Sequence, residues 1–173
     1  MRTQMTTVVA VLMLCAPGNA RAQATASDLA GRWEAEAYTL PLNTDFDVSV
    51  WGAGATSVRD VALSIEKSGE AALTVTRRVV DGDGKTVAAS VSVEDARFRI
   101  GAPGEPNGIR TDYAVTVESA ERRYPDDPGY RWPIDGLRVR LTTLDREDGR
   151  SLEVRFDTPE GRGSFWAELH RQG

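Results

Sequence analysis

The stretch DLAGRWEAEAYTL, Asp28 to Leu40, decides the fold expected for this chain. From Trp33 onward, apolar residues occupy every second position and glutamates stand between them. A period of two is typical of a β-strand that has one face against a core and the other in water. The stretch therefore predicts a first strand whose dry face carries Trp33.

The same alternation recurs along most of the chain. Glycine-containing segments separate the alternating runs and supply the positive backbone angles that turns between strands require. In the alternating run that begins near residue 86, Val87, Ala89, Val91 and Val93 share one face. We expect eight strands, near residues 32–40, 61–66, 71–80, 86–100, 111–119, 137–144, 151–157 and 164–171.

One irregularity decides between eight strands and nine. The apolar parity is odd at Val91 and Val93 but even at Phe98 and Ile100, so Glu94-Asp95 is either a tight turn or a bulge. This dipeptide lacks the Gly or Asn that a two-residue hairpin prefers, which favours the bulge and one long strand. Eight strands in up-and-down order make the last antiparallel to the first, so that the two can pair. The prediction is an all-β, eight-stranded antiparallel barrel, with a β-sandwich as the alternative.

Helical structure is expected only as a short turn before the first strand. Residues Ala26 to Ala30 fit such a turn, with Ser27 as its cap. No run of ten or more residues has a convincing helical period.

The beginning of the chain has the pattern of a secretory signal peptide. Arg2 is followed by a mostly apolar run, Val8 to Ala16, which is too short to span a bilayer, and then by small residues at cleavage spacing. Cleavage after Ala22 would leave residues 23–173 as a single domain in the periplasm or outside the cell. Lipidation of Cys15 is the alternative to release as a soluble protein, but the bulky Leu14 before it argues against a lipoprotein signal.

The amino-acid composition limits which disulfides and which binding partners are expected. The only cysteine of the 173 residues is Cys15, so no disulfide is expected after cleavage. The formal net charge of -5 disfavours nucleic acid and anionic membranes as partners. We expect a monomer without stable membrane insertion.

Three motifs converge at one end of an eight-strand trace: Gly31-Arg32-Trp33, Thr111-Asp112-Tyr113 and Arg171. Together they resemble the lipocalins and their wider calycin relatives, which carry Gly-x-Trp and Thr-Asp-Tyr at the closed end of an eight-stranded barrel. The resemblance implies that Trp33 plugs the barrel floor and that Arg171 lies over it.

The long loops, residues 41–60 and 120–136, are expected at the opposite end. They bring aromatic residues to one mouth, namely Phe46, Trp51, Tyr124, Tyr130 and Trp132. These rings either line a ligand entrance or pack the loops onto the barrel. The nearby arginines 122, 123 and 131 would attract an anionic ligand, although neighbouring aspartates offset them.

No catalytic residues, metal ligands or cofactor motif are identified. His170 is the only histidine, and the alternation places it on the wet face of the last strand. The acidic residues 81 and 83 are explained by a hairpin turn, because the other oxygen ligands of a calcium loop are missing. Enzymatic activity is therefore the least supported class.

Two functions stay open. The first is an exported soluble protein that holds a small hydrophobic, lipid-like ligand in the barrel. The second is a protein-binding barrel such as a periplasmic protease inhibitor. The start TASDLAGRW, Thr25 to Trp33, resembles exported metalloprotease inhibitors in which the segment before Gly-x-Trp occupies the protease cleft.

Overall fold

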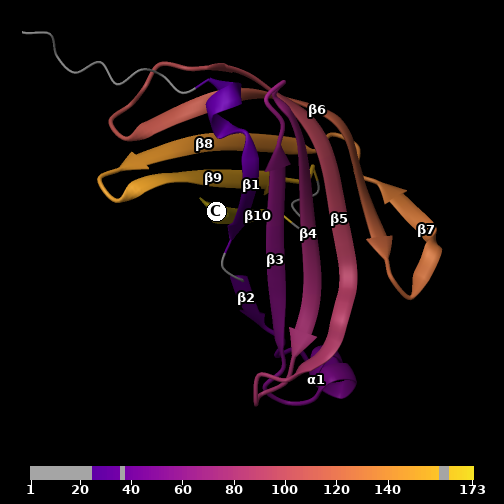
Figure 1. Cartoon of the computed structure of the whole chain (residues 1–173). Coiled ribbons are helices and arrows are strands. Elements are labelled where there is room, and N and C mark those ends of the chain that lie inside the picture. Colours follow the sequence, from indigo (N-terminus) through magenta and orange to yellow (C-terminus); the bar gives the residue numbers. More distant parts are fainter. Residues whose placement is uncertain (1–24, 36–37, 160–163) are drawn as a thin grey trace, which may run out of the picture.

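The computed structural model describes residues 25–35, 38–159 and 164–173. Its ten strands belong to one antiparallel sheet (Figure 1). They are β1 (Gly31–Ala35), β2 (Tyr38–Pro41), β3 (Thr56–Ile65), β4 (Glu70–Val80), β5 (Thr86–Pro103), β6 (Arg110–Tyr124), β7 (Asp127–Pro133), β8 (Arg138–Arg146), β9 (Gly149–Asp157) and β10 (Phe165–Arg171). A 3-10 helix, η1 (Ala26–Leu29), precedes β1, and a short helix, α1 (Asp45–Trp51), follows β2.

The sheet closes on itself. β1 pairs with β10 on one side and with β3 on the other, which completes a ring. Outside this ring, β2 continues along β3 beyond β1, and β7 folds back onto β6. Eight strands form the ring, so the predicted eight-stranded antiparallel barrel is confirmed and the β-sandwich alternative is wrong.

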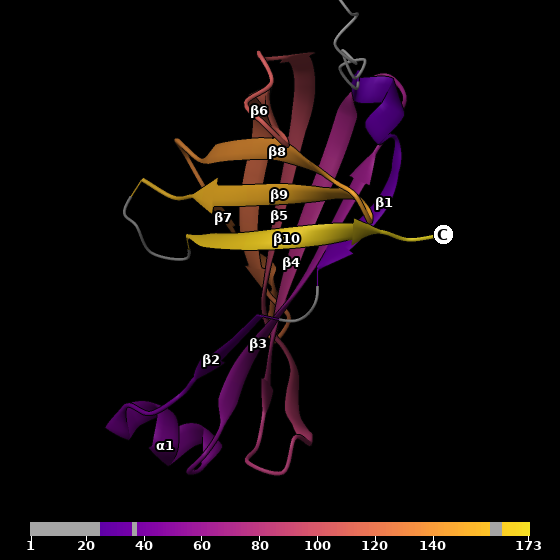
Figure 2. The same cartoon turned by 90° about the vertical axis from the view of Figure 1, so that its left-hand side faces the viewer.

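The strands run in two crossing directions. In Figure 2, β8, β9 and β10 pass across the front of the long strands β3 to β6. Of these, β3 to β5 continue past this crossing layer to a distal tip that carries α1 (Figures 1 and 2). A second, smaller core supports the tip and consists of Leu42, Ala55 and Val79, with Trp51, Ala88 and Val91 packed against it.

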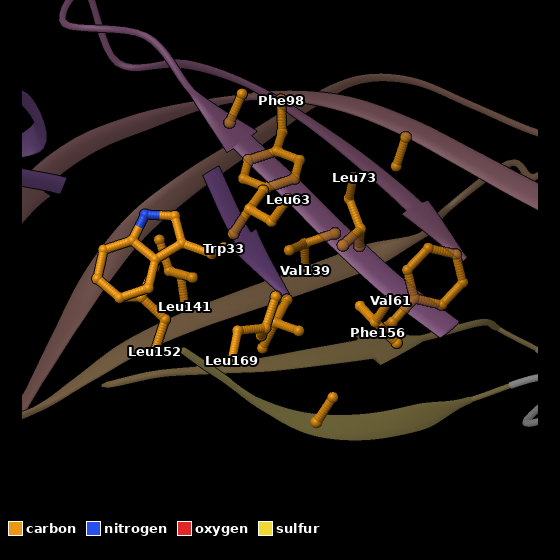
Figure 3. Close-up of a cluster of buried hydrophobic side chains, with 14 of the residues drawn as sticks. Trp33, Val61, Leu63, Leu73, Phe98, Val139, Leu141, Leu152, Phe156 and Leu169 are labelled. Atoms are coloured by element: carbon orange, nitrogen blue, oxygen red, sulfur yellow. The ribbon is translucent and has the colours of Figure 1, made fainter. Parts of the chain in front are cut away.

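The main core lies between the two layers. Side chains from the long strands meet side chains from β8 to β10, as Figure 3 shows for Leu63 and Phe98 against Leu141 and Leu152. Trp33, Phe98 and Phe156 are at most 1% exposed. A hollow beside these side chains would leave part of their surface exposed, so the barrel around them is filled.

Both long loops contain regular structure that the sequence pattern did not predict. Residues 41–60 contain α1 and the first half of β3, which begins at Thr56 rather than near residue 61. The side chain of Thr44 caps α1 by accepting a hydrogen bond from the Asp47 N–H at 3.1 Å. Residues 120–136 contain the end of β6 and all of β7. The helix α1 is shorter than the runs on which detection of a helical period depends. The alternation of β7 is interrupted by Pro128, Gly129 and Pro133.

The single long strand predicted for residues 86–100 is confirmed, but the register shift lies elsewhere. Glu94 and Asp95 pair regularly with Val75 and Thr74. On the β6 side the shifts fall between Arg97 and Phe98 and between Ile100 and Pro103. On the β4 side they fall closer to the tip, between Arg77 and Val79 and between Val79 and Val80. As a result Val87 is 46% exposed and Ala89 is also exposed, so the prediction that both share a buried face is wrong. Here the strand has run past the crossing layer that would cover it.

The short turn before the first strand is present as η1. Its cap is Thr25 rather than Ser27, because Thr25 and Asp28 form a capping box. Leu29, the last residue of η1, is fully buried in the main core. The 3-10 helix therefore covers the closed end of the barrel.

Candidate functional site

The structure brings Gly31, Trp33 and Arg171 together at the closed end, called the floor here. Trp33 and Arg171 are opposite in the β1–β10 register, and the guanidinium lies 5.4 Å from the centroid of the indole ring. The indole N–H of Trp33 donates to the carbonyl of Leu29 at 2.8 Å. Gly31 has φ of 140°, and a Cβ there would lie 3.2 Å from Nε of Arg171. The floor is therefore a packed closure with little room for a ligand.

The motif Thr111-Asp112-Tyr113 begins β6 beside β8. Asp112 accepts a hydrogen bond from the hydroxyl of Thr142 at 2.6 Å. Tyr113 belongs to the same core as Trp33 and is 6% exposed, and this burial raises the pKa of its phenol. The motif thus fastens β6 to β8 and adds a ring to the core.

The stretch from Thr25 to Leu29 packs against the floor. Leu29 has no exposed surface, and the carbonyl of Ala30 accepts a hydrogen bond from Arg171. From Thr25 onward this segment is part of the barrel closure, which does not favour its insertion into a protease cleft.

The expected group of mouth aromatics lies in two places. Phe46 and Trp51 are on α1 at the distal tip, where Trp51 packs on the small core and Phe46 is 74% exposed. Tyr124 and Trp132 lie on β6 and β7, beside the barrel (Figures 1 and 2). Tyr130 lies on β7, and its side chain is outside the described residues. The two groups are separated because β3 to β5 extend well past the barrel.

A pocket of about 490 Å³ opens beside the β6–β7 hairpin and is called the mouth pocket here. Two of the expected aromatics border it, Tyr124 and Trp132, which are 37% and 51% exposed. The remaining lining comes from the ends of β6 and β7, the β7–β8 connection and the residues after β9, namely Arg122, Pro133, Ile134, Asp135, Thr158 and Pro159. The mouth pocket thus combines apolar and aromatic walls with a few polar groups, Arg122, Asp135 and Thr158, as ligand sites commonly do.

The three arginines expected near the mouth are each paired with a carboxylate. Arg123 pairs with Asp95 at 2.7 Å and Arg131 with Glu121 at 2.9 Å. Arg122 donates to Oε1 of Glu94 through both Nε and Nη2, at 2.9 and 2.8 Å. These partners come from β5 and β6, not from the loop aspartates that the sequence pattern offered.

The Glu94–Arg122 pair lies on the inner face of the sheet. Glu94 is two residues from Ala96, which belongs to the main core, and side chains two apart on a strand share a face. Glu94 is 7% exposed, so its charge is almost withdrawn from water. Arg122 supplies the compensating charge and also borders the mouth pocket.

The described residues contain no group of three or more His, Cys, Asp or Glu side chains placed to hold a metal ion. His170 is exposed on β10, opposite Glu34 in the β1–β10 register. Within the same part of the chain, no helix is both long and apolar enough to cross a membrane.

Comparison with known proteins identifies no relative of this chain, so the fold is established from its geometry alone. No family model matches the chain, and no curated protein or solved structure is significantly similar to it. The closed eight-stranded antiparallel barrel is consistent with a calycin-like architecture.

Proposed function

We propose that the protein is an exported, lipocalin-like barrel that binds a small hydrophobic molecule. The observation that carries the proposal is the mouth pocket, where Tyr124 and Trp132 remain partly exposed beside Ile134 and Pro133. Exposed aromatic rings around a concavity are a favourable surface for an apolar ligand.

The filled core supports the mouth as the ligand site rather than the barrel centre. Trp33, Phe98 and Phe156 occupy the centre and have almost no exposed surface. A ligand there would have to displace well-packed side chains, at a cost of several kcal/mol. The mouth pocket requires no such displacement.

Export is the second part of the proposal. Residues 1–22 carry the signal-peptide pattern described above and lie outside the described residues. The intact mass of protein recovered from the periplasm or culture medium tests this part. A mass equal to that of residues 23–173 supports export with cleavage after Ala22, whereas a mass that includes residues 1–22 contradicts it.

Binding is tested with a neutral hydrophobic fluorophore, N-phenyl-1-naphthylamine, titrated into the purified protein. We expect saturable binding, and we expect Trp132→Ala to weaken it about tenfold, because an aromatic contact contributes about 1 to 1.5 kcal/mol. The matched control is Trp166→Ala on β10, since Trp166 is 52% exposed and Trp132 is 51% exposed. Equal binding by the two variants, or no saturable binding by the native protein, would contradict the proposal.

The natural ligand is sought by extracting natively purified protein with organic solvent and analysing the extract by mass spectrometry. A stoichiometric apolar molecule in the native extract, reduced in the Trp132→Ala extract, supports binding at the mouth pocket. A stoichiometric molecule that is retained equally by both proteins contradicts that location.

A further inference from the structure

Two arginines stand side by side on the inner face of the sheet, just beyond the main core. Arg59 of β3 and Arg77 of β4 are directly opposite in register. Each is two residues from a core valine, Val61 or Val75, and therefore points to the same face as that valine. Side chains directly opposite in an antiparallel pair start about 5 Å apart, and like charges in this position repel.

Neither arginine has a carboxylate partner among the described residues. Arg77 donates from Nε to the hydroxyl of Ser57 at 2.8 Å, and the guanidinium of Arg59 lies 5.9 Å from the ring centroid of Phe165. Both side chains are half-buried. The other half-buried arginines of the described chain all have partners: Arg78 with Asp60, Arg122 with Glu94, Arg123 with Asp95, and Arg150 with Asp145.

Because the other half-buried arginines of the described chain are paired, the positive charges of Arg59 and Arg77 are available to an anion from outside the chain. The formal net charge is -5, so carboxylates are plentiful on this protein. Among the residues that the structure describes, two half-buried guanidinium groups nonetheless have no carboxylate partner, and these two are opposite each other. Holding like charges together in a partly desolvated site costs free energy that a bound anion would recover.

The arginine pair shares its face with the mouth pocket. Arg77 is opposite Ser92, Ser92 is two residues from Glu94, and Glu94 is opposite Arg122, which borders the pocket. Arg122 is already neutralised by Glu94. Within the described part of this face, the positive charges without a carboxylate partner are therefore those of Arg59 and Arg77.

We propose that Arg59 and Arg77 bind the anionic head of an acidic amphiphile whose apolar part occupies the mouth pocket. This inference rests on the proposed function for the apolar part only. Two guanidinium forks fit the oxygen atoms of a carboxylate, a sulfate or a phosphate monoester, each through paired hydrogen bonds. The ligand class is thus a molecule with one acidic group and one apolar chain or ring system.

The test compares two probes of equal chain length, decanoate and the uncharged decanamide, by isothermal titration at low salt. We expect the native protein to bind decanoate about tenfold or more tightly than decanamide, because hydrogen bonds to charged groups stabilise by about 1.5 to 3 kcal/mol. In Arg59→Gln/Arg77→Gln the two affinities should become equal. Inorganic sulfate, which has no apolar part, tests the anion site alone.

The matched control is Arg138→Gln/Arg140→Gln, which removes two exposed arginines from β8. It lowers the net charge by the same amount, so a purely long-range effect on decanoate would appear in both variants. Circular dichroism and urea unfolding check that each variant is folded. Relief of repulsion predicts that Arg59→Gln/Arg77→Gln is at least as stable as the native protein.

The outcomes separate this inference from the proposed function. Equal binding of decanoate and decanamide by the native protein would overturn the anion site and keep the hydrophobic site. Sulfate binding that depends on Arg59 and Arg77, without binding of either decanoyl probe, would keep the anion site and overturn the hydrophobic one. An unchanged preference for decanoate in Arg59→Gln/Arg77→Gln would also overturn the inference, and no binding of any probe would overturn both.

Discussion

The guanidinium of Arg171 lies over the indole ring of Trp33, 5.4 Å from its centroid, and donates a hydrogen bond to the carbonyl of Ala30. Arg171 belongs to the last strand of the ring and Trp33 to the first, and the two are opposite in register. The contact therefore joins the strands that close the barrel and covers the end of its core.

Removal of Arg171 should weaken this closure. We expect Arg171→Leu to lower the free energy of unfolding by about 1 to 2 kcal/mol, from a lost cation–π contact and a lost hydrogen bond to a charged group. Urea unfolding followed by tryptophan fluorescence measures the change. Arg140→Leu, at an exposed position on β8, should change stability by less than about 0.5 kcal/mol. Equal effects of the two substitutions would show that the contact does not stabilise the floor.

Gly31 should not tolerate a side chain. Its φ of 140° is unfavourable for residues with a Cβ, and that Cβ would lie 3.2 Å from Nε of Arg171. We expect Gly31→Ala to cost about 1 to 3 kcal/mol. Because Arg171 has a flexible side chain, most of the cost should be backbone strain and should persist in the Arg171→Leu background. A double-mutant cycle measures this, and disappearance of the cost in that background would instead identify crowding as the cause.

Loss of Arg122 should be more costly than loss of an exposed arginine. The side chain of Glu94 is 9% exposed and depends on Arg122 for compensation of its charge. We expect Arg122→Gln to destabilise by about 3 kcal/mol, as is typical when a buried ion pair loses one partner. The comparison variant is Arg99→Gln, since Arg99 and Glu70 form an exposed pair that should contribute less than about 1 kcal/mol. Glu94→Gln/Arg122→Gln should recover part of the loss, and a double variant less stable than Arg122→Gln would argue against the explanation.

Protonation of Glu168 should lower the free energy of unfolding of the protein at acidic pH. Two hydrogen bonds from Arg146 and one from the hydroxyl of Ser151 at 2.5 Å lower the pKa of Glu168 from 4.5 to about 2. The folded state therefore binds this proton less tightly than the unfolded state. The contribution is complete above pH 4.5 and is lost as the pH falls from 4.5 toward 2.

The corresponding variant is Glu168→Gln. At pH 6 it should be less stable than the native protein by about 2 kcal/mol, which is below the full linkage value because the carboxylate is partly exposed. Near pH 2.5 the difference should shrink, as urea unfolding at the two pH values would reveal. Glu70→Gln, which removes an exposed carboxylate paired with Arg99, serves as the comparison variant at both pH values. A stability difference for Glu168→Gln that is the same at both pH values would rule out this linkage.

Much of the architecture follows from local pattern. Alternation around Trp33, Leu63, Val154 and Phe165 predicts the strands and their buried faces, because the side-chain period of a strand depends only on the strand itself. The missed helix α1 has too few residues for a helical period to emerge, and the missed strand β7 contains two prolines and a glycine that interrupt its alternation. The parity slip in β5 predicted a bulge at Glu94-Asp95, but the register shifts lie to either side of this dipeptide, where the strand leaves the barrel and beyond Arg97.

The candidate site was only partly predictable. Tyr124 and Trp132 border the mouth pocket as the aromatic pattern allowed, whereas Phe46 and Trp51 lie on the distal tip. The length of β3 to β5 beyond the crossing layer decides this separation, and that length has no signal in the loop composition. Pro159 and Ile134 join the pocket only because the strands before and after them converge there.

The sequence by itself determined the alternating strands and the place of Trp33 on a dry face, since alternation requires no knowledge of neighbouring strands. It favoured an eight-stranded barrel over a β-sandwich, and the pairing of β1 with β10 and with β3 decided for the barrel. Only the tertiary structure decided which charges compensate one another. The β5–β6 register places Arg122 opposite Glu94, whereas the β3–β4 register places Arg59 opposite Arg77. Register is a relation between two strands that the pattern within either strand does not specify, and a shift of one residue would exchange every inner side chain for an outer one.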